Sequence, residues 1–452
     1  MTQNPWKEFP KFDKKIEIKF PKLKVKEING IKLYYFQDKT IELTGFRAFF
    51  ECGSINESKI GTAEIVADLM TKNTLLKSAE EIFAFTDSLG CDLECSVSHD
   101  FTAFTYSGLS KFLSDGVSLI SEMIFTPNFL QEELDRTIAT VKSDLEFSYS
   151  TPSAISHIVA NRILFEGHRY QFGTTAEHND LDNISVGDCK DYYENVFCKT
   201  SFALICVGNF EESELFKLVE TNFKQNTDSK TQIINSTIFN FNSGIAIIDS
   251  PFNQQTNLKL GMPTISINHP DFLALSVANT LFGGYFLSRL NHNLREEKGL
   301  TYGINSIIQR YKLASVFFIS SSISAEKTKE GIGEILNEMQ IISTQNAKEE
   351  EITRAKQYLM GTSLRLFESS LSILSSTTNL LISDLDIDHY EKRFDKLQNL
   401  SFDEVYAAQR KYFKPENYVF SLVGNAQKLS EDFSESTNTH YDKFGDRIKI
   451  NG

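Results

Sequence analysis

The sequence repeats itself once at long range, and this feature limits the possible folds more than any other. Three segments of the first half return in the second half in the same order and at nearly one offset. A repeat of this length indicates a duplicated domain rather than a solenoid unit. The offsets are 215 residues between GVSLISEM from Gly116 and GIGEILNEM from Gly331, 218 between EELDR and EEITR at Arg136 and Arg354, and 216 between ICVGN and SLVGN at Gly208 and Gly424.

Each copy alternates short β-like runs with longer amphipathic helices. The text after Asn29-Gly30 suggests a hairpin with strands in LYYF and TGFRAFFE. We therefore predict an α+β fold of two homologous domains from an internal duplication, each a mainly antiparallel sheet packed with helices on one side. A polar stretch near residues 224–244 is the natural linker. The boundary is predicted close to residue 230, giving domains 1–229 and 230–452.

Composition excludes several classes of function. The formal net charge is −14, which disfavours binding to nucleic acid, since such proteins usually carry a basic surface. The six cysteines form no C-x-x-C pair, so they are read as buried free thiols of a reducing compartment. No stretch reaches about 18 apolar residues, and the first residues contain no apolar signal segment. We expect a cytoplasmic protein without a membrane span, or a periplasmic one if a leader has been removed.

The stretch GTAEIVADLMTKNT, residues 61–74, reads as a helix that carries two acids in register. Glu64 and Asp68 are four residues apart and share a face, with Ala67 between them. The pair Gly53-Ser54 precedes this helix. Taken together with the long-range repeat, these segments resemble the pitrilysin/insulinase metallopeptidase family. The resemblance is to its short, two-domain branch in particular, which includes the mitochondrial processing peptidases. In that family, a hairpin ending in Gly-Ser leads into a helix with the zinc motif H-x-x-E-H.

The resemblance implies that the zinc site has been lost here. Glu64 and Asp68 occupy the slots of the two histidines, Ala67 that of the catalytic glutamate, and Asp144 in TVKSDLEF that of the third ligand. Histidines at i and i+4 can share one zinc ion, while the glutamate acts as general base on the bound water. Alanine cannot accept a proton, so this chain alone is not expected to cut peptides by the family mechanism. The acids either bind no metal or form a weak site for a hard cation.

A second motif lies in LFGGYFLSRLNHNLREEKGLTYGINS, residues 281–306. It is similar to the family's C-terminal motif, in which an Arg and a Tyr flank a turn rich in Lys and Gly. Arg295 and Tyr302 occupy those slots, and the implied role is to contact the substrate beside the zinc. Both side chains can donate hydrogen bonds to a peptide carbonyl or its oxyanion. The alternative is a solvated helix end with local ion pairs.

The function implied by the resemblance is that of a non-catalytic, substrate-binding subunit of a heterodimeric zinc metallopeptidase. Its partner would be a homologous chain with H-x-x-E-H that holds the zinc, so this chain would bind no cofactor itself. The alternatives are an inactive structural or peptide-binding homologue, and a peptidase-like protein with a carboxylate-based metal site. An unfolded peptide substrate would add as a strand to a sheet edge. The residues expected at that edge are Leu93, Glu94, Cys95, Ser96 and Val97.

Overall fold

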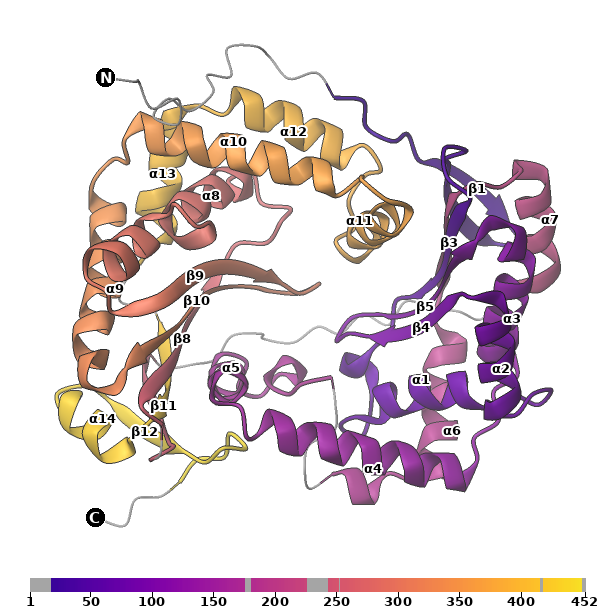
Figure 1. The fold of residues 1–452 in the computed structure, drawn as a ribbon, viewed down its shortest axis with the longest axis horizontal. Coiled ribbons are helices and arrows are strands. Elements are labelled where there is room, and N and C mark those ends of the chain that lie inside the picture. Colours follow the sequence, from indigo (N-terminus) through magenta and orange to yellow (C-terminus); the bar gives the residue numbers. More distant parts are fainter. Residues whose placement is uncertain (1–17, 175–179, 226–242, 252, 415–417, 449–452) are drawn as a thin grey trace, which may run out of the picture.

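The computed structural model describes residues 18–174, 180–225, 243–251, 253–414 and 418–448, which form two six-stranded sheets (Figure 1). The strand orders are β1-β2-β6-β3-β5-β4 and β12-β7-β11-β8-β10-β9. The first sheet consists of β1 (Lys24–Ile28), β2 (Ile31–Gln37), β3 (Leu43–Phe50), β4 (Asp92–Val97), β5 (Thr102–Leu109) and β6 (Phe202–Gly208). The second consists of β7 (Gly244–Asp249), β8 (Gln255–Thr264), β9 (Thr301–Arg310), β10 (Ser315–Ser324), β11 (Val419–Gly424) and β12 (Asn438–Tyr441).

The two sheets share one topology, which confirms the predicted duplication. The order β2-β6-β3-β5-β4 in the first half corresponds to β7-β11-β8-β10-β9 in the second. Most neighbouring strands are antiparallel, while β2–β6, β7–β11 and β7–β12 are parallel. The predicted hairpin is wrong in its pairing. LYYF lies in β2 and TGFRAFFE begins in β3, but β6 inserts between these two strands.

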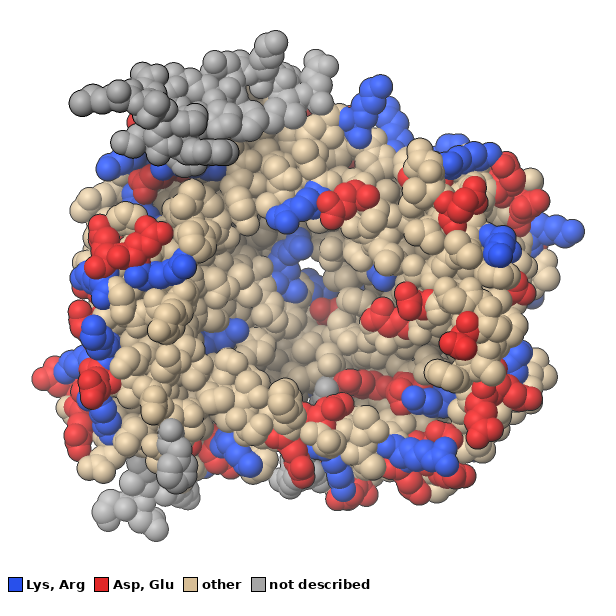
Figure 2. All heavy atoms as spheres, in the orientation of Figure 1, with Lys and Arg blue, Asp and Glu red and all other residues tan. Residues whose placement is uncertain are grey.

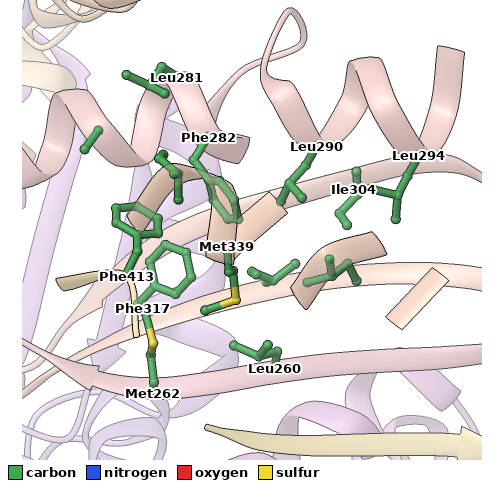
Figure 3. Packing of buried hydrophobic residues seen from close by; sticks show 14 of the residues in the cluster. Leu260, Met262, Leu281, Phe282, Leu290, Leu294, Ile304, Phe317, Met339 and Phe413 are labelled. Carbon is green, nitrogen blue, oxygen red and sulfur yellow. The ribbon is translucent and has the colours of Figure 1, made fainter. Parts of the chain in front are cut away.

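One face of each sheet is covered by helices of its own half, and a hydrophobic core fills the space between them. In the second half, the core packs side chains from β8, β9 and β10 against the helices above (Figure 3). The first-half helices are α1 (Thr62–Lys72), α2 (Ala79–Leu89), α3 (Leu113–Phe125), α4 (Gln131–Ser148), α6 (Val186–Asn195) and α7 (Glu212–Asn222). The second-half helices are α8 (Phe272–Asn279), the π-helical segments Thr280–Gly284 and Asn291–Glu297, α9 (Thr328–Thr344), α10 (Glu349–Arg365), α12 (His389–Asn399), α13 (Phe402–Tyr412) and α14 (Ala426–Asp432).

The opposite face of each sheet is covered by a helix from the other half. Helix α5 (Pro152–Leu164) packs against β8 and β11 of the second sheet, and α11 (Ser370–Ile382) packs against β3 and β6 of the first (Figure 1). Ile373 and Leu374 of α11 form one buried cluster with Ile205 and Val207 of β6. The prediction of helices on one side was therefore incomplete, because the two halves exchange the helices that cover their second faces. The predicted boundary at residue 230 lies outside the described residues.

The turn between β9 and β10 also joins the two halves. Asp100 is buried and accepts hydrogen bonds from the Lys312 backbone N–H at 2.9 Å and from the Tyr170 hydroxyl. The Tyr170 and Tyr311 rings stack with centroids 4.6 Å apart. The Lys312 ammonium lies 3.0 Å from a Glu51 carboxylate oxygen. These contacts fix the hairpin of the second half on the loop that follows β4 in the first half.

The exchange of α11 predicts a clear difference between two leucines of that helix. Leu374 is fully buried, whereas Leu371 is 45% exposed. We expect Leu374→Ala to lower the free energy of unfolding by about 2–5 kcal/mol, because it leaves a cavity against β3 and β6. Leu371→Ala, the matched control on the same helix, should cost less than about 1 kcal/mol. Equal losses in urea unfolding would contradict the assignment of α11 to the first sheet.

Burial of His157 predicts an acid-sensitive fold. Burial on α5 lowers the pKa of His157 to about 4, from 6.5. As the pH falls, the imidazole of His157 therefore takes up a proton in the unfolded chain before it does so in the folded protein. The contribution of neutral His157 to the free energy of unfolding is present above pH 6.5 and is lost between pH 6.5 and 4. A shift of this size corresponds to about 3 kcal/mol. Denaturant unfolding at pH 7 and pH 4 should show a smaller pH effect in His157→Gln than in the exposed control His292→Gln.

Candidate functional site

Helix α1, which carries the expected zinc-motif positions, is held at its start by a buried ion pair. Glu57 accepts hydrogen bonds from the backbone N–H groups of Gly61 and Ala63, both at 2.8 Å. The same carboxylate pairs with Arg169, and only 1% of the Glu57 side chain is exposed. A carboxylate at the first turn satisfies helix N–H groups that have no intrahelical acceptor. The motif helix therefore keeps a firmly fixed position although its motif has changed.

The motif positions themselves are not arranged as a metal site. Ala67 is buried, while Glu64 and Asp68 are half-buried. Asp68 accepts a hydrogen bond of 2.7 Å from Thr137 of α4 and lies 3.5 Å from the Lys72 ammonium. Asp144, the expected third ligand, is exposed on α4. Among the described residues, the structure gathers no three His, Cys, Asp or Glu side chains that could hold a metal ion.

The expected peptide edge lies beside this helix. Leu93–Val97 form most of β4, the outermost strand of the first sheet, and α1 packs against β4. A cavity of about 830 Å³ follows the strand. The apolar side chains that line it come from both sides of β4, with α2 on one side and α11 on the other. The charged side chains that line it include both basic and acidic residues. The lining includes Ile82, Phe83, Leu93 and Leu371, together with Arg47, Lys72, Asp92, Glu94 and Glu133.

Tyr302 lies on the equivalent edge strand of the second sheet, within an irregularity of β9. Ser321 pairs with Ile304 and Ile323 with Thr301, so β9 has one residue more than β10 between these pairs. Such a bulge bends the strand and turns a side chain away from its regular direction. The Thr301 hydroxyl stabilises the bulge by donating to the Ser322 carbonyl at 2.8 Å. As a result, Tyr302 is 91% exposed.

Arg295 is held by an aromatic ring rather than by an acid. Its guanidinium carbon lies 4.4 Å from the centroid of the Phe286 ring. No ion pair of Arg295 with a carboxylate occurs within the part of the chain that the structure describes. Phe286 lies in a turn closed by the Ser288 N–H to Tyr285 carbonyl hydrogen bond, and its side chain is 60% exposed. A cation above a ring face is attracted electrostatically and keeps its own N–H donors available.

Asn291 connects the three segments that carry Phe286, Arg295 and Tyr302. Its side-chain amide donates to the Tyr285 carbonyl at 3.3 Å, to the Ser288 hydroxyl at 3.1 Å and to the Ile304 carbonyl at 2.8 Å. It lies one turn before Arg295 in the segment Asn291–Glu297 and is buried. The sequence analysis did not single out Phe286 or Asn291. The only signal was their position within the motif segment, because the distances appear only in the fold.

Comparison with known proteins identifies the family. The family model described as Insulinase (Peptidase family M16) matches residues 37–172, and the model described as Peptidase M16 inactive domain matches residues 183–359. The chain belongs to the M16 peptidase family. This agrees with the family that the two motifs resemble.

Relatives of this M16 protein include peptidases and an inactive domain. It is 20% identical over 400 residues to a protein of Bacillus subtilis named uncharacterized zinc protease YmxG, covering 87% of this chain and 96% of that protein. It is 20% identical to the mitochondrial-processing peptidase subunit beta of Caenorhabditis elegans, covering 72% and 73%. The crystal structure of a peptidase M16 inactive domain from Pseudomonas fluorescens superimposes with a TM-score of 0.82 at 19% identity, covering 89% of this chain and 98% of that one.

The α1 helix of this M16 protein thus lacks the residues of the expected zinc motif. Neither motif histidine is present in α1, and Ala67 takes the position of the base. A zinc hydrolase of this type requires its general base to activate the bound water.

Among the described residues, no helix combines the length and the apolar character needed to cross a bilayer.

Asn291 should be the residue on which the geometry of this M16 motif depends. We expect Asn291→Ala to lower the free energy of unfolding by about 1–3 kcal/mol, because it leaves a buried backbone carbonyl and a buried hydroxyl without donors. Asn305 is an exposed residue of β9, and Asn305→Ala is the matched control. Thermal and urea unfolding measure the difference. If both variants were as stable as the wild type, Asn291 would not be the link between these segments.

Proposed function

We propose that this chain is the non-catalytic, substrate-binding subunit of a two-chain zinc peptidase. Arg295 and Tyr302 supply hydrogen-bond donors to an active site whose zinc is held by a homologous H-x-x-E-H subunit. The observation that carries the proposal is the presentation of this pair. Tyr302 is 91% exposed on the bulge of β9, and the Arg295 guanidinium rests on the Phe286 ring. This chain has no zinc motif of its own beside which the two side chains could act.

The chemistry of the pair suits a reaction centre on another chain. A phenol O–H and a guanidinium both donate to a peptide carbonyl and to the oxyanion that develops when water attacks it. Neither side chain is consumed by ion pairing with a carboxylate of the described residues. Exposed aromatic and arginine side chains are also those that dominate binding energies at protein interfaces. The name of the Caenorhabditis elegans relative, a subunit of a processing peptidase, is consistent with a two-chain enzyme.

Binding of an extended peptide would use the free edge of β4. An edge strand presents backbone N–H and C=O groups that a peptide can pair with, and the pockets along it select side chains. The cavity along β4 contains both apolar and charged side chains at this edge. A peptide strand on Leu93–Val97 would therefore gain backbone hydrogen bonds here even though the neighbouring helix α1 cannot catalyse its cleavage.

The proposal predicts activity only in the mixture of two chains. This chain would be combined with an H-x-x-E-H chain of the same organism, and cleavage of a fluorogenic peptide would be followed. We expect Arg295→Ala and Tyr302→Phe to lower kcat of the mixture by about 10²–10³-fold, as for the loss of one oxyanion donor. The matched control is Leu287→Ala in the neighbouring turn, since Leu287 is 52% exposed and makes no polar contact to the pair. The control should retain activity.

Three results separate the alternatives. If the two chains form a complex that is active with Arg295→Ala and Tyr302→Phe, the proposed role of the pair is wrong while the partnership holds. A complex that binds peptide but never cleaves it supports the inactive, peptide-binding homologue. Full activity of the H-x-x-E-H chain alone, unchanged by addition of this chain, would refute the partnership.

A further inference from the structure

The face of the second sheet that carries α5 divides into an apolar part and a polar part. Beneath α5, the sheet contributes buried apolar side chains, including Val316, Phe318 and Val419. A side chain at Gly261 would collide with Leu164 of α5, which shows how closely the helix approaches. Further along β8 and β10, the residues on this face are polar. They are Asn257 and Lys259 of β8 and Ser320 and Ser322 of β10, all half-buried, with Ser421 of β11 fully buried.

Lys259 lies at the border of these two parts and has no acidic partner. In the register it is opposite Ser320 of β10 and Ser421 of β11. Its ammonium nitrogen is 4.6 Å from the centroid of the Phe318 ring, and it makes neither a hydrogen bond nor an ion pair with any described residue. A half-buried ammonium without an acceptor is costly, because it has lost part of its hydration without replacement. Consistent with this, burial lowers the pKa of Lys259 to about 8.

Two further donors without acceptors lie near Lys259, on its register neighbour Ser421 and on the ring of His157, which packs against the same phenylalanine. Asn161 donates a hydrogen bond of 3.2 Å to Nε2 of His157, so the neutral imidazole carries its hydrogen on Nδ1. That Nδ1 and the Ser421 hydroxyl are both buried, and neither has a partner among the described residues. The His157 ring lies 5.6 Å from the Phe318 ring, on which Lys259 also rests. Helix α5 and strands β8 and β11 therefore bring an ammonium, an imidazole N–H and a hydroxyl to one place.

We infer that Lys259, His157 and Ser421 form a binding site for a carboxylate group. All three are donors and lack an acceptor, and a carboxylate supplies two oxygens that accept about four hydrogen bonds. The ammonium adds a charge-assisted bond, which is about twice as strong as a neutral one. Lys259 is the accessible member and makes the first contact. The flexible four-carbon stem of the lysine allows it to move as the carboxylate approaches the two buried donors.

The carboxylate can come from an acidic side chain of a peptide or from a small carboxylic acid. Both present the same group to the three donors, so the site is defined by this chemistry. The inference uses only contacts within this chain and does not depend on the proposed partner subunit. It is therefore tested on the isolated chain, where the peptidase assay has no bearing on the result.

The test measures binding and the state of Lys259 together. A fluorescent, unstructured peptide rich in Glu and its Gln counterpart are titrated against the isolated chain by anisotropy, and sodium acetate is used as the small probe. Lysine acylation at pH 8, mapped by mass spectrometry, reports whether each probe shields Lys259. We expect Lys259→Met to weaken binding of the Glu peptide at least tenfold and Lys259→Arg to retain much of it. The matched control is Lys329→Met, which removes the same charge from the exposed face of α9.

The outcomes distinguish the sources of the carboxylate. Preference for the Glu peptide over the Gln peptide, lost in Lys259→Met and reduced in Ser421→Ala, supports a site for peptide carboxylates. Shielding of Lys259 by acetate without preference for the Glu peptide supports a site for small carboxylic acids. If neither probe shields Lys259, or if Lys259→Met and Lys329→Met weaken binding equally, the inference is overturned.

Discussion

The arrangement of this protein depends on the exchange of one helix between its halves. Each six-stranded sheet carries apolar side chains on both faces, and apolar surface of this kind must be covered to be stable in water. One face of each sheet is covered by helices of its own half, but the opposite face is covered by α5 or α11 from the other half. Removing either helix would expose a strip of Ile, Val and Phe side chains in the other half. The exchange therefore fixes how the halves face one another and where the central hollow lies (Figure 2).

Both proposed regions for substrate lie on edge strands that correspond in the duplication. β4 ends the first sheet and β9 ends the second. In the first half, the edge keeps regular pairing and borders a long cavity, which suits pairing with an extended chain. In the second half, the edge is broken by the bulge that turns Tyr302 outward. The same position in the fold thus presents a regular strand edge in one half and an exposed tyrosine side chain in the other.

Much of the fold could be predicted from the sequence, because repeated segments and alternating periodicity are local signals. The duplication and the α+β class follow from them, while the motif marks Tyr302 and Arg295 as candidates whose role stays a prediction. The insertion of β6 between β2 and β3 could not be predicted, since it joins segments about 170 residues apart. The support of Arg295 by Phe286 was also hidden, because a cation over an aromatic ring has no fixed spacing in sequence. The same applies to Lys259, whose lack of an acid becomes visible only once its neighbours are known.

The exchanged helices also bear on how such a chain can arise. α5 and α11 are both 13 residues long and begin at Pro152 and Ser370, at the same 218-residue offset that separates Arg136 from Arg354. They are the same element in the two copies, so the protein has the form of a domain-swapped homodimer joined into one polypeptide. One half on its own would expose the sheet face that the helix of the other half covers. A chain cut between its two halves should therefore keep its fold only while the two fragments stay associated.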